Sequence, residues 1–401
     1  LQFVFPSIIM MIFTSIYSVV DGLFVSNFVG KSAFAAVNLI MPFLMGISAL
    51  GFMIGTGGSA IVAKTLGEGK IENANEYFSM LVYITAIGGI IIAILSMFLV
   101  KPVAILFGAS GTLLDNCILY GRILCISLPA FMLQNVFQSF FVTAEKPHLG
   151  LRVIVIAGVT NMVLDFLFVA VFHLGLPGAG LATVCGEFIG GLFPLFYFGR
   201  KNSSLLKLGK THFHGRILLK TCTNGSSELM TNLSSSVVNA LYNMQLMKFA
   251  GEDGVAAYGT IMYVNFIFVS IFFGYAIGSA PIVSYHYGAN NQDELKNLFH
   301  KSIRLIGTWA VSLFIIAQLI ATPLATLFVG YDQGLFELTR SGFRLYSFAF
   351  LINGFNIYGS AFFTALNNGL LSALISFLRT LVFQMAVVLL LPLLLGINGV
   401  W

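Results

Sequence analysis

Charged residues are scarce in this sequence. They make up 9% of its 401 residues, whereas an ordinary soluble domain carries about 25%. Hydrophobic residues reach 58%, and the mean hydropathy is +0.94. Uncharged runs at 32–63, 77–100, 123–144 and 305–331 each exceed the roughly 20 residues that cross a bilayer as a helix. An ordinary soluble fold is therefore excluded, and we predict an all-α integral membrane protein.

Cysteine is also rare, and catalytic motifs are missing. The four cysteines are scattered without paired spacing, which indicates neither a disulfide framework nor a zinc site. The sequence contains no HExxH, GxSxG or Walker A pattern, so the usual signatures of a metalloprotease, a serine hydrolase and a nucleotide-binding loop are lacking. We therefore expect the protein not to be an enzyme and to need no cofactor.

The apolar residues group into a series of membrane spans. We predict eleven of them, at residues 1–27, 35–62, 78–100, 116–143, 150–172, 178–199, 226–248, 255–284, 303–328, 340–366 and 370–395. We therefore expect the lipid bilayer to be a partner of this chain.

The basic residues indicate topology. The net charge is +5, but most Lys and Arg residues lie in connections that follow even-numbered spans, and the segment 200–220 holds six of them with no acid. By the positive-inside rule these connections are cytoplasmic, and so is the N-terminus. A cytoplasmic linker explains segment 200–220 better than a nucleic-acid site, and no nucleic-acid partner is expected.

The sequence contains an internal duplication. An offset of 221 residues aligns Gly30 with Gly251, Pro102 with Pro323, and Asn135 with Asn356. Leu or Phe matches would arise by chance in so apolar a chain, but Gly, Pro and Asn at one fixed offset indicate a repeat.

The repeat predicts the arrangement of the helices. A unit of six spans ends on the side where it began, so both copies have the same orientation and are parallel repeats. We predict an N-lobe at 1–199 with helices 1–6, a cytoplasmic basic linker at 200–221, and a C-lobe at 222–401. The C-lobe would hold helices 7–11 and the start of a twelfth, most of which is missing from this chain.

Four acidic residues lie within the predicted spans, namely Asp21, Asp165, Glu187 and Glu228. An ionised carboxylate at the bilayer centre costs roughly 2.5–3.5 kcal/mol on insertion scales, so intramembrane acids usually line a cavity or an ion path. These four residues are the functional candidates. Glu228 lies only about two residues into its span, and contact with interfacial water would also explain it.

Several of these residues should converge. Asn161 and Asp165 are four residues apart, as are Thr183 and Glu187, so each pair shares a helix face. Counted from the loops at about 1.5 Å per residue, Asp21, Asp165 and Thr183 all lie in the outer half of the membrane. Such oxygen ligands suit a proton or Na⁺. The alternative is a hydrogen-bonded clamp between packed helices.

Other polar residues within the spans are accessory candidates. Gln134 and Gln138 lie one turn apart on the fourth span, and Asn356 lies in the second repeat. Interhelical hydrogen bonds explain most residues of this kind, but some could line a substrate cavity. Pro6 lies within the first span and would kink it or free a backbone carbonyl.

Three strings resemble the multidrug and toxic compound extrusion (MATE) transporters of the larger flippase superfamily. They are VDGLFV at 20–25, NMVLD at 161–165 and LGLPGAGLAT at 174–183, and GINGVW at 396–401 echoes the third. The resemblance covers the whole chain. It implies two six-helix lobes around a central cleft, with drug export coupled to entry of H⁺ or Na⁺.

The resemblance also implies roles for single residues. Asp21, Asn161, Asp165 and Thr183 match the N-lobe cation site of the family, which holds H⁺ or Na⁺. Pro6 matches a proline at which the first helix bends when that site is protonated. Glu228 is only a loose match to the C-lobe acids of some family branches.

From the residues and the resemblance we expect a monomeric antiporter in the cell inner (plasma) membrane. It would export amphipathic, mainly cationic compounds, because carboxylates and aromatic walls favour them. One alternative is a lipid-linked oligosaccharide flippase, which would carry basic cleft residues. Arg122, Arg344 and Arg379 are the only Arg residues near span interiors. Another is a channel or receptor, but no filter-like loop or soluble domain is visible.

Overall fold

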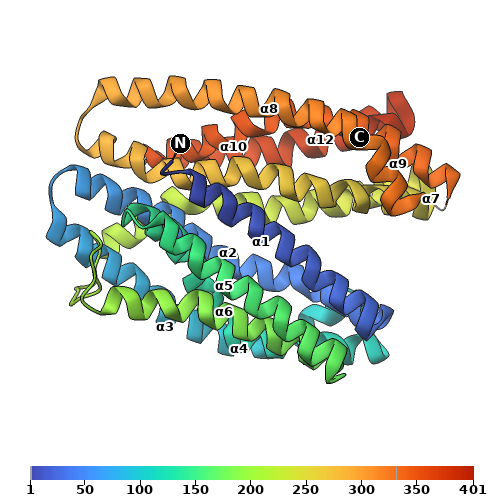
Figure 1. The fold of residues 1–401 in the computed structure, drawn as a ribbon, viewed down its shortest axis with the longest axis horizontal. Coiled ribbons are helices and arrows are strands. Elements are labelled where there is room, and N and C mark those ends of the chain that lie inside the picture. The colour runs from blue at the N-terminus through green and yellow to red at the C-terminus, as the bar shows by residue number, and fades with distance from the viewer. Residues whose placement is uncertain (1, 331) are drawn as a thin grey trace.

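The protein is a bundle of long helices arranged in two lobes. The computed structural model describes residues 2–330 and 332–401, and the described residues form no strand. The side chains of residues 22, 23, 26, 27, 31, 32 and 252 are not described, and positions 22 and 23 belong to the first string. The all-α prediction is confirmed (Figure 1).

The first lobe contains the first six helices. Their bounds are α1 Phe5–Phe24, α2 Lys31–Gly67, α3 Ile71–Leu106, α4 Gly111–Thr143, α5 Pro147–Asp165 and α6 Gly175–Gly199, and the π-helical segments η1 Val25–Val29 and η2 Phe166–Val171 extend α1 and α5. An irregular segment, 200–214, leads to the second lobe. We call it the linker.

The second lobe repeats this pattern with longer and more interrupted helices. Its elements are α7 Gly215–Gly288, α8 Gln292–Val329, α9 Gln333–Tyr346, η3 Ser347–Ala349, α10 Phe350–Ala365, α11 Gly369–Phe377, η4 Leu378–Phe383, α12 Gln384–Leu395 and η5 Gly396–Gly399. The helix α7 is in fact two helices, because Gly251 has φ 61° and ψ −145°, which no helix contains.

The backbone carries the duplication that the sequence predicts. Gly30 has φ 113° and Gly251, 221 residues later, has φ 61°. Gly175 has φ 64° and Gly396, again 221 residues later, has φ 60°. Residues with a Cβ rarely adopt these left-handed values, so the same helix breaks recur at the same offset. The two-lobe repeat is therefore confirmed by conformation as well as by sequence.

Most helices are long and apolar enough to cross a membrane. Among the described residues nine stretches meet this description, and α1 adds the shorter apolar stretch Phe5–Asp21. The first half of α7 is not one of the nine, because it is rich in Ser, Thr and Asn and contains Glu228. These helices establish a multi-pass membrane protein.

Aromatic residues fill the interior of the first lobe. Phe78 of α3 is fully buried, and its ring centroid lies 4.9 Å from that of Phe140 on α4 and 5.1 Å from that of Phe198 on α6. Both contacts are edge to face, an arrangement that adds to the free energy gained by burial. This cluster holds α3, α4 and α6 together near the linker.

The two lobes meet at the end of the molecule where the linker lies. A Cβ on Gly67 of α2 would collide with the carbonyl of Tyr285, and one on Gly288 of α7 would collide with the carbonyl of Lys64. The Lys64 ammonium also lies 5.2 Å from the ring centroid of Tyr287 in the other lobe. From this end the two bundles diverge toward the opposite end (Figure 1).

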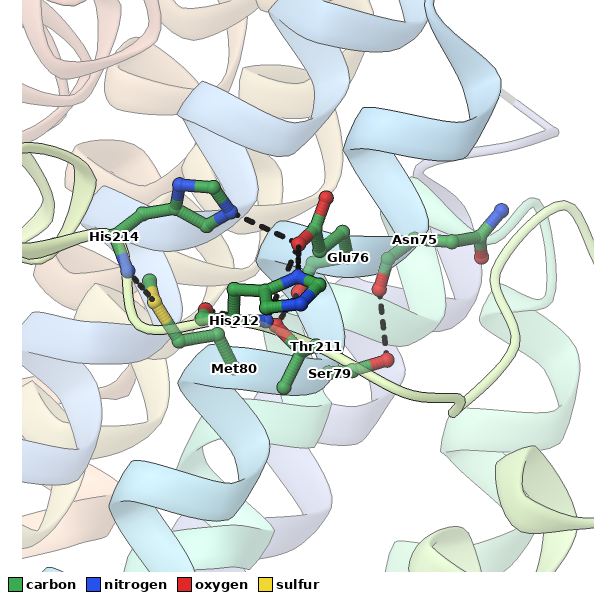
Figure 2. Close-up of polar contacts among 7 residues, drawn as sticks. All are labelled: Asn75, Glu76, Ser79, Met80, Thr211, His212 and His214. Carbon is green, nitrogen blue, oxygen red and sulfur yellow. Dashed lines mark hydrogen bonds and ion pairs between the residues drawn. The ribbon is translucent and has the colours of Figure 1, made fainter.

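The linker is attached to α3 by side-chain hydrogen bonds (Figure 2). His212 Nδ1 lies 2.9 Å and His214 Nε2 3.0 Å from Oε1 of Glu76. Two further bonds run from linker backbone amides, that of Lys207 to Asn75 Oδ1 at 2.6 Å and that of Gly209 to Ser79 Oγ at 3.0 Å. The linker therefore follows the surface of the first lobe up to the start of α7.

Candidate functional site

The centre of the first lobe holds two neighbouring carboxyl groups. Asp21 lies one turn before the end of α1, and Asp165 is the last residue of α5. Each carboxyl group lies within electrostatic reach of the other. Asp165 is fully buried, and neither of its oxygens has a hydrogen-bond partner among the described residues. The structure thus brings together two of the four acids that the sequence indicates as functional candidates.

Asn161 and the helix α6 complete this side of the cluster. Asn161 lies one turn before Asp165, is buried, and has no partner for its amide oxygen or nitrogen among the described residues. A Cβ on Gly186 of α6 would lie 3.2 Å from Asn161 Cβ and 3.0 Å from the carbonyl oxygen of Ala157. Only glycine permits this approach, which carries Thr183 and Glu187 toward the aspartates.

Thr183 and Glu187 lie on the face of α6 that this approach presents. The hydroxyl of Thr183 donates to the carbonyl of Ala179 at 3.1 Å, which leaves its oxygen lone pairs as acceptors. Glu187 is half-buried and lies within electrostatic reach of Asp21, beside Ser127 of α4. We call the set Asp21, Asn161, Asp165, Thr183 and Glu187 the N-lobe cluster.

Two tyrosines border the N-lobe cluster and were not predicted. Tyr17 lies one turn before Asp21, near Gln134 and Glu187. Tyr120 of α4 is fully buried beside Asp21, Asp165 and Glu187 and has no partner for its hydroxyl among the described residues. The spacing of four residues from Asp21 was a signal for Tyr17. No comparable signal marks Tyr120.

The accessory candidates separate in space. Gln134 packs against Gly190 of α6 and lies near Tyr17, so it borders the N-lobe cluster. Gln138 is buried one turn further along α4, and Asn356 is half-buried on α10 of the other lobe. No hydrogen bond between described residues links either of them to the N-lobe cluster. Pro6 lies in the first turn of α1, where proline is tolerated, so the bend of this helix stays a prediction.

The chemistry of the N-lobe cluster limits what it could hold. Among the described residues, no three His, Cys, Asp or Glu side chains lie together as a metal site. Within the cluster, the two aspartates with one amide and one hydroxyl oxygen form a small set of hard ligands, suited to a proton or a monovalent cation such as Na⁺. The orphaned buried oxygens of Asp165 and Asn161 fit such an occupant, because burying them without partners is costly.

Glu228 lies elsewhere, at a cavity between the lobes. The cavity has a volume of about 320 Å³ and is lined from the first lobe by Met11, Phe52 and Thr56, and from the second by Glu228 and Arg379 among others. Arg379 was noted in the sequence only as an arginine near a span interior. The structure shows that it shares this cavity with Glu228, and we call it the inter-lobe cavity.

Comparisons with known proteins agree with this architecture. The multidrug export protein MepA of Staphylococcus saprophyticus is 22% identical over 406 residues, covering all of this chain and 87% of that protein. MepA of a Staphylococcus aureus strain is 22% identical over 404 residues, with 100% and 88% covered. A solved outward-facing MATE family transporter superposes with a TM-score of 0.94 at 24% identity, covering all of this chain and 90% of the other.

The family profile matches each lobe separately. The MatE family matches residues 6–167 and again 229–390, which together form more than half of the chain. The two matches fall on the two copies of the internal repeat. The chain belongs to the MATE transporter family.

Proposed function

We propose that this protein is a secondary antiporter that exports amphipathic, mainly cationic compounds in exchange for H⁺ or Na⁺. The observation that carries the proposal is the pair of neighbouring carboxyl groups inside the first lobe, Asp21 and the fully buried Asp165. The relatives named multidrug export proteins support the export of drugs. The inter-lobe cavity provides a compartment for the compound itself.

The coupling would follow from the cost of two buried negative charges. Two neighbouring carboxylates repel each other in a medium of low dielectric constant, and a proton or Na⁺ relieves that repulsion. A state of the protein that brings Asp21 and Asp165 together therefore binds the ion more tightly than a state that separates them. Ion binding would shift the population of lobe arrangements and favour release of the exported compound.

The orientation completes this proposal. By the positive-inside rule the linker and the N-terminus face the cytoplasm of a cell whose plasma membrane contains the protein. The lobes meet at the linker end, where Gly67 and Gly288 allow backbone contact, so this arrangement would face outward. Rocking of the parallel repeats would open the inter-lobe cavity to the cytoplasm.

The test is transport by the full-length protein in proteoliposomes. A fluorescent organic cation should accumulate under an imposed H⁺ or Na⁺ gradient, and comparing the two gradients identifies the ion. Asp21→Asn should reduce gradient-driven accumulation by about tenfold, the order of a typical coupling free energy. Asp293→Asn, at an exposed acid in the first turn of α8, is the matched control. Transport that needs no gradient, or an undiminished rate in Asp21→Asn, would refute the coupling.

A further inference from the structure

One polar face of α7 forms a wall of the inter-lobe cavity. Glu228, Thr231, Asn232 and Ser235 all line the cavity, and their spacing of three, four and seven residues places them on one side of the helix. The carboxylate of Glu228 makes no hydrogen bond or ion pair with any other described residue. The wall thus presents a half-buried negative charge to the cavity.

Arg379 supplies a positive charge to the same cavity. It lies in the π-helical segment η4, and such segments often occur at functional sites. Its Nε lies 3.2 Å from Thr380 Oγ1 and its Nη2 3.4 Å from Thr231 Oγ1. Its Nη1 is buried and has no partner among the described residues. The guanidinium is therefore bound to α7 through Nη2, while Nη1 keeps N–H donors that no described residue accepts.

The two charges lie near each other but do not form a pair. Each contributes to the electrostatic environment of the other, yet no ion pair joins Glu228 to Arg379, although both are described residues. Half-buried charges that lack a direct partner are costly. A ligand carrying both a cation and an anion would supply a partner to each of them.

We propose that the inter-lobe cavity selects zwitterionic amphiphiles, with a ligand ammonium at Glu228 and a ligand carboxylate at Arg379. The proposal rests on the proposed export function and adds a requirement to it, namely that a favoured compound carries a carboxylate as well as a cation. A guanidinium can donate two parallel hydrogen bonds to a carboxylate, and Nη1 is available for one of them. Phe52, Phe266 and Phe273 line the same cavity and offer flat apolar surface to an aromatic ring system.

The duplication shows that this pair of charges is particular to the second lobe. At the 221-residue offset Glu228 corresponds to Ser7, and Arg379 corresponds to Gly158. Neither counterpart is charged. The pair is therefore not a remnant of the repeated framework, and it requires an explanation specific to the cavity.

The test compares two dyes that differ in one charge. Rhodamine B is a zwitterion at neutral pH, whereas its ethyl ester keeps the cation and lacks the carboxylate. Binding of each to the full-length protein in nanodiscs would be measured by fluorescence polarisation without an ion gradient. Wild type should bind rhodamine B about tenfold more tightly than the ester, the order expected for a charge-assisted hydrogen bond.

Variants separate the two charges. Arg379→Gln should abolish the preference for rhodamine B while the ester still binds, which also shows that the variant is folded, and Arg379→Lys should restore part of the preference. Glu228→Gln should weaken the binding of both dyes, because both carry the cation. Arg344→Gln is the matched control, because Arg344 is exposed on α9 and is not among the residues that line the cavity.

Equal binding of the two dyes to wild type, or a preference that survives Arg379→Gln, would overturn the inference. These results would not contradict the proposed gradient-driven export, because the binding measurement uses no gradient. A chain that shows the dye preference but no gradient-driven transport would instead refute the proposed antiport and retain the zwitterion site.

Discussion

Gly186 sets the distance between α5 and α6 and therefore the geometry of the N-lobe cluster. An added Cβ would lie 3.0 Å from the carbonyl oxygen of Ala157 and 3.2 Å from Asn161 Cβ. Both distances are shorter than ordinary van der Waals contact. Since one neighbour is backbone, neither helix can yield without moving the residues that follow, including Asp165.

We expect Gly186→Val to cost about 1–3 kcal/mol of stability, because overpacking forces the two helices apart. The measurement is thermal unfolding of the purified protein, with a lower melting temperature as the result. Gly88→Val is the matched control, because a Cβ on Gly88 has no heavy atom within 4 Å. If the two variants melted at the same temperature, the close approach of α5 and α6 would not limit stability.

The sequence predicted all five members of the N-lobe cluster but not the two tyrosines that border it. Asp21, Asp165 and Glu187 stand out because a carboxylate within an apolar run has no inexpensive explanation. Tyr120 does not stand out, because a tyrosine carries enough apolar surface to belong in any membrane helix. Arg379 was visible, but only the fold could show that it shares a cavity with Glu228, 151 positions earlier in the chain.

At the scale of elements, Glu76 is the main attachment of the linker. It lies near the linker end of α3, whose 36 residues span about 54 Å, well beyond a bilayer core of about 30 Å. We therefore place Glu76 outside the membrane. Hydrogen bonds from His212 and His214 hold the pKa of its carboxyl well below the usual range. The stability that the ionised Glu76 carboxylate adds through these hydrogen bonds is present above pH 4.5 and is lost only as the pH falls toward 2.

Glu76→Gln should loosen the linker, because a neutral amide accepts weaker hydrogen bonds from the two histidines. Trypsin should then cleave after Lys207 and Lys210 several-fold faster in the purified full-length protein, since proteolysis follows local opening. Gel electrophoresis or mass spectrometry would follow the products. Glu72→Gln is the control, because Glu72 is exposed in the first turn of α3. Equal cleavage rates would show that the backbone attachments suffice.

Hydropathy located the helices but not all of their ends. The sequence predicted spans beginning at residues 78, 226 and 303, whereas α3, α7 and α8 begin at Ile71, Gly215 and Gln292. A charged residue ends an apolar run without ending a helix, so these helices project beyond the bilayer. The π-helical segment η4 was not predictable either, because the widened turn depends on tertiary packing and has no composition of its own.

At the scale of the whole molecule, small residues allow the lobes to touch at the linker end. Gly67 lies against Tyr285, and Gly288 lies against Lys64. Interfaces between membrane helices commonly use small residues in this way, because close backbone approach replaces the hydrophobic driving force that lipid removes. This contact therefore stabilises the arrangement in which the lobes are closed at the linker.

We expect Gly288→Leu to hold the lobes apart at the linker end, because the side chain would collide with the Lys64 carbonyl. Electron paramagnetic resonance between spin labels at positions 72 and 293, in a background without the four native cysteines, should report longer distances. Gly199→Leu is the control, since a Cβ there meets nothing within 4 Å. An unchanged distance distribution would show that other contacts determine closure.

The two repeats carry different polar residues at corresponding positions. At the 221-residue offset Asp21 corresponds to Tyr242, Asn161 to Val382 and Asp165 to Ala386. The second lobe therefore has no carboxylate or amide at the positions that match Asp21, Asn161 and Asp165, just as the first lobe has no charge at the positions that match Glu228 and Arg379. This difference supports the proposal that the coupling ion and the exported compound bind at separate places.

The attached linker also restricts how the lobes can move. The backbone amide of His214 bonds to Met80 Sδ on α3 at 3.1 Å, and the next residue, Gly215, already begins α7. Almost no unattached residues therefore separate the part of the linker bound to the first lobe from the start of α7. Sliding of one lobe past the other would have to break this series of hydrogen bonds. Rotation about the start of α7 would preserve them, so the connection acts as a short pivot.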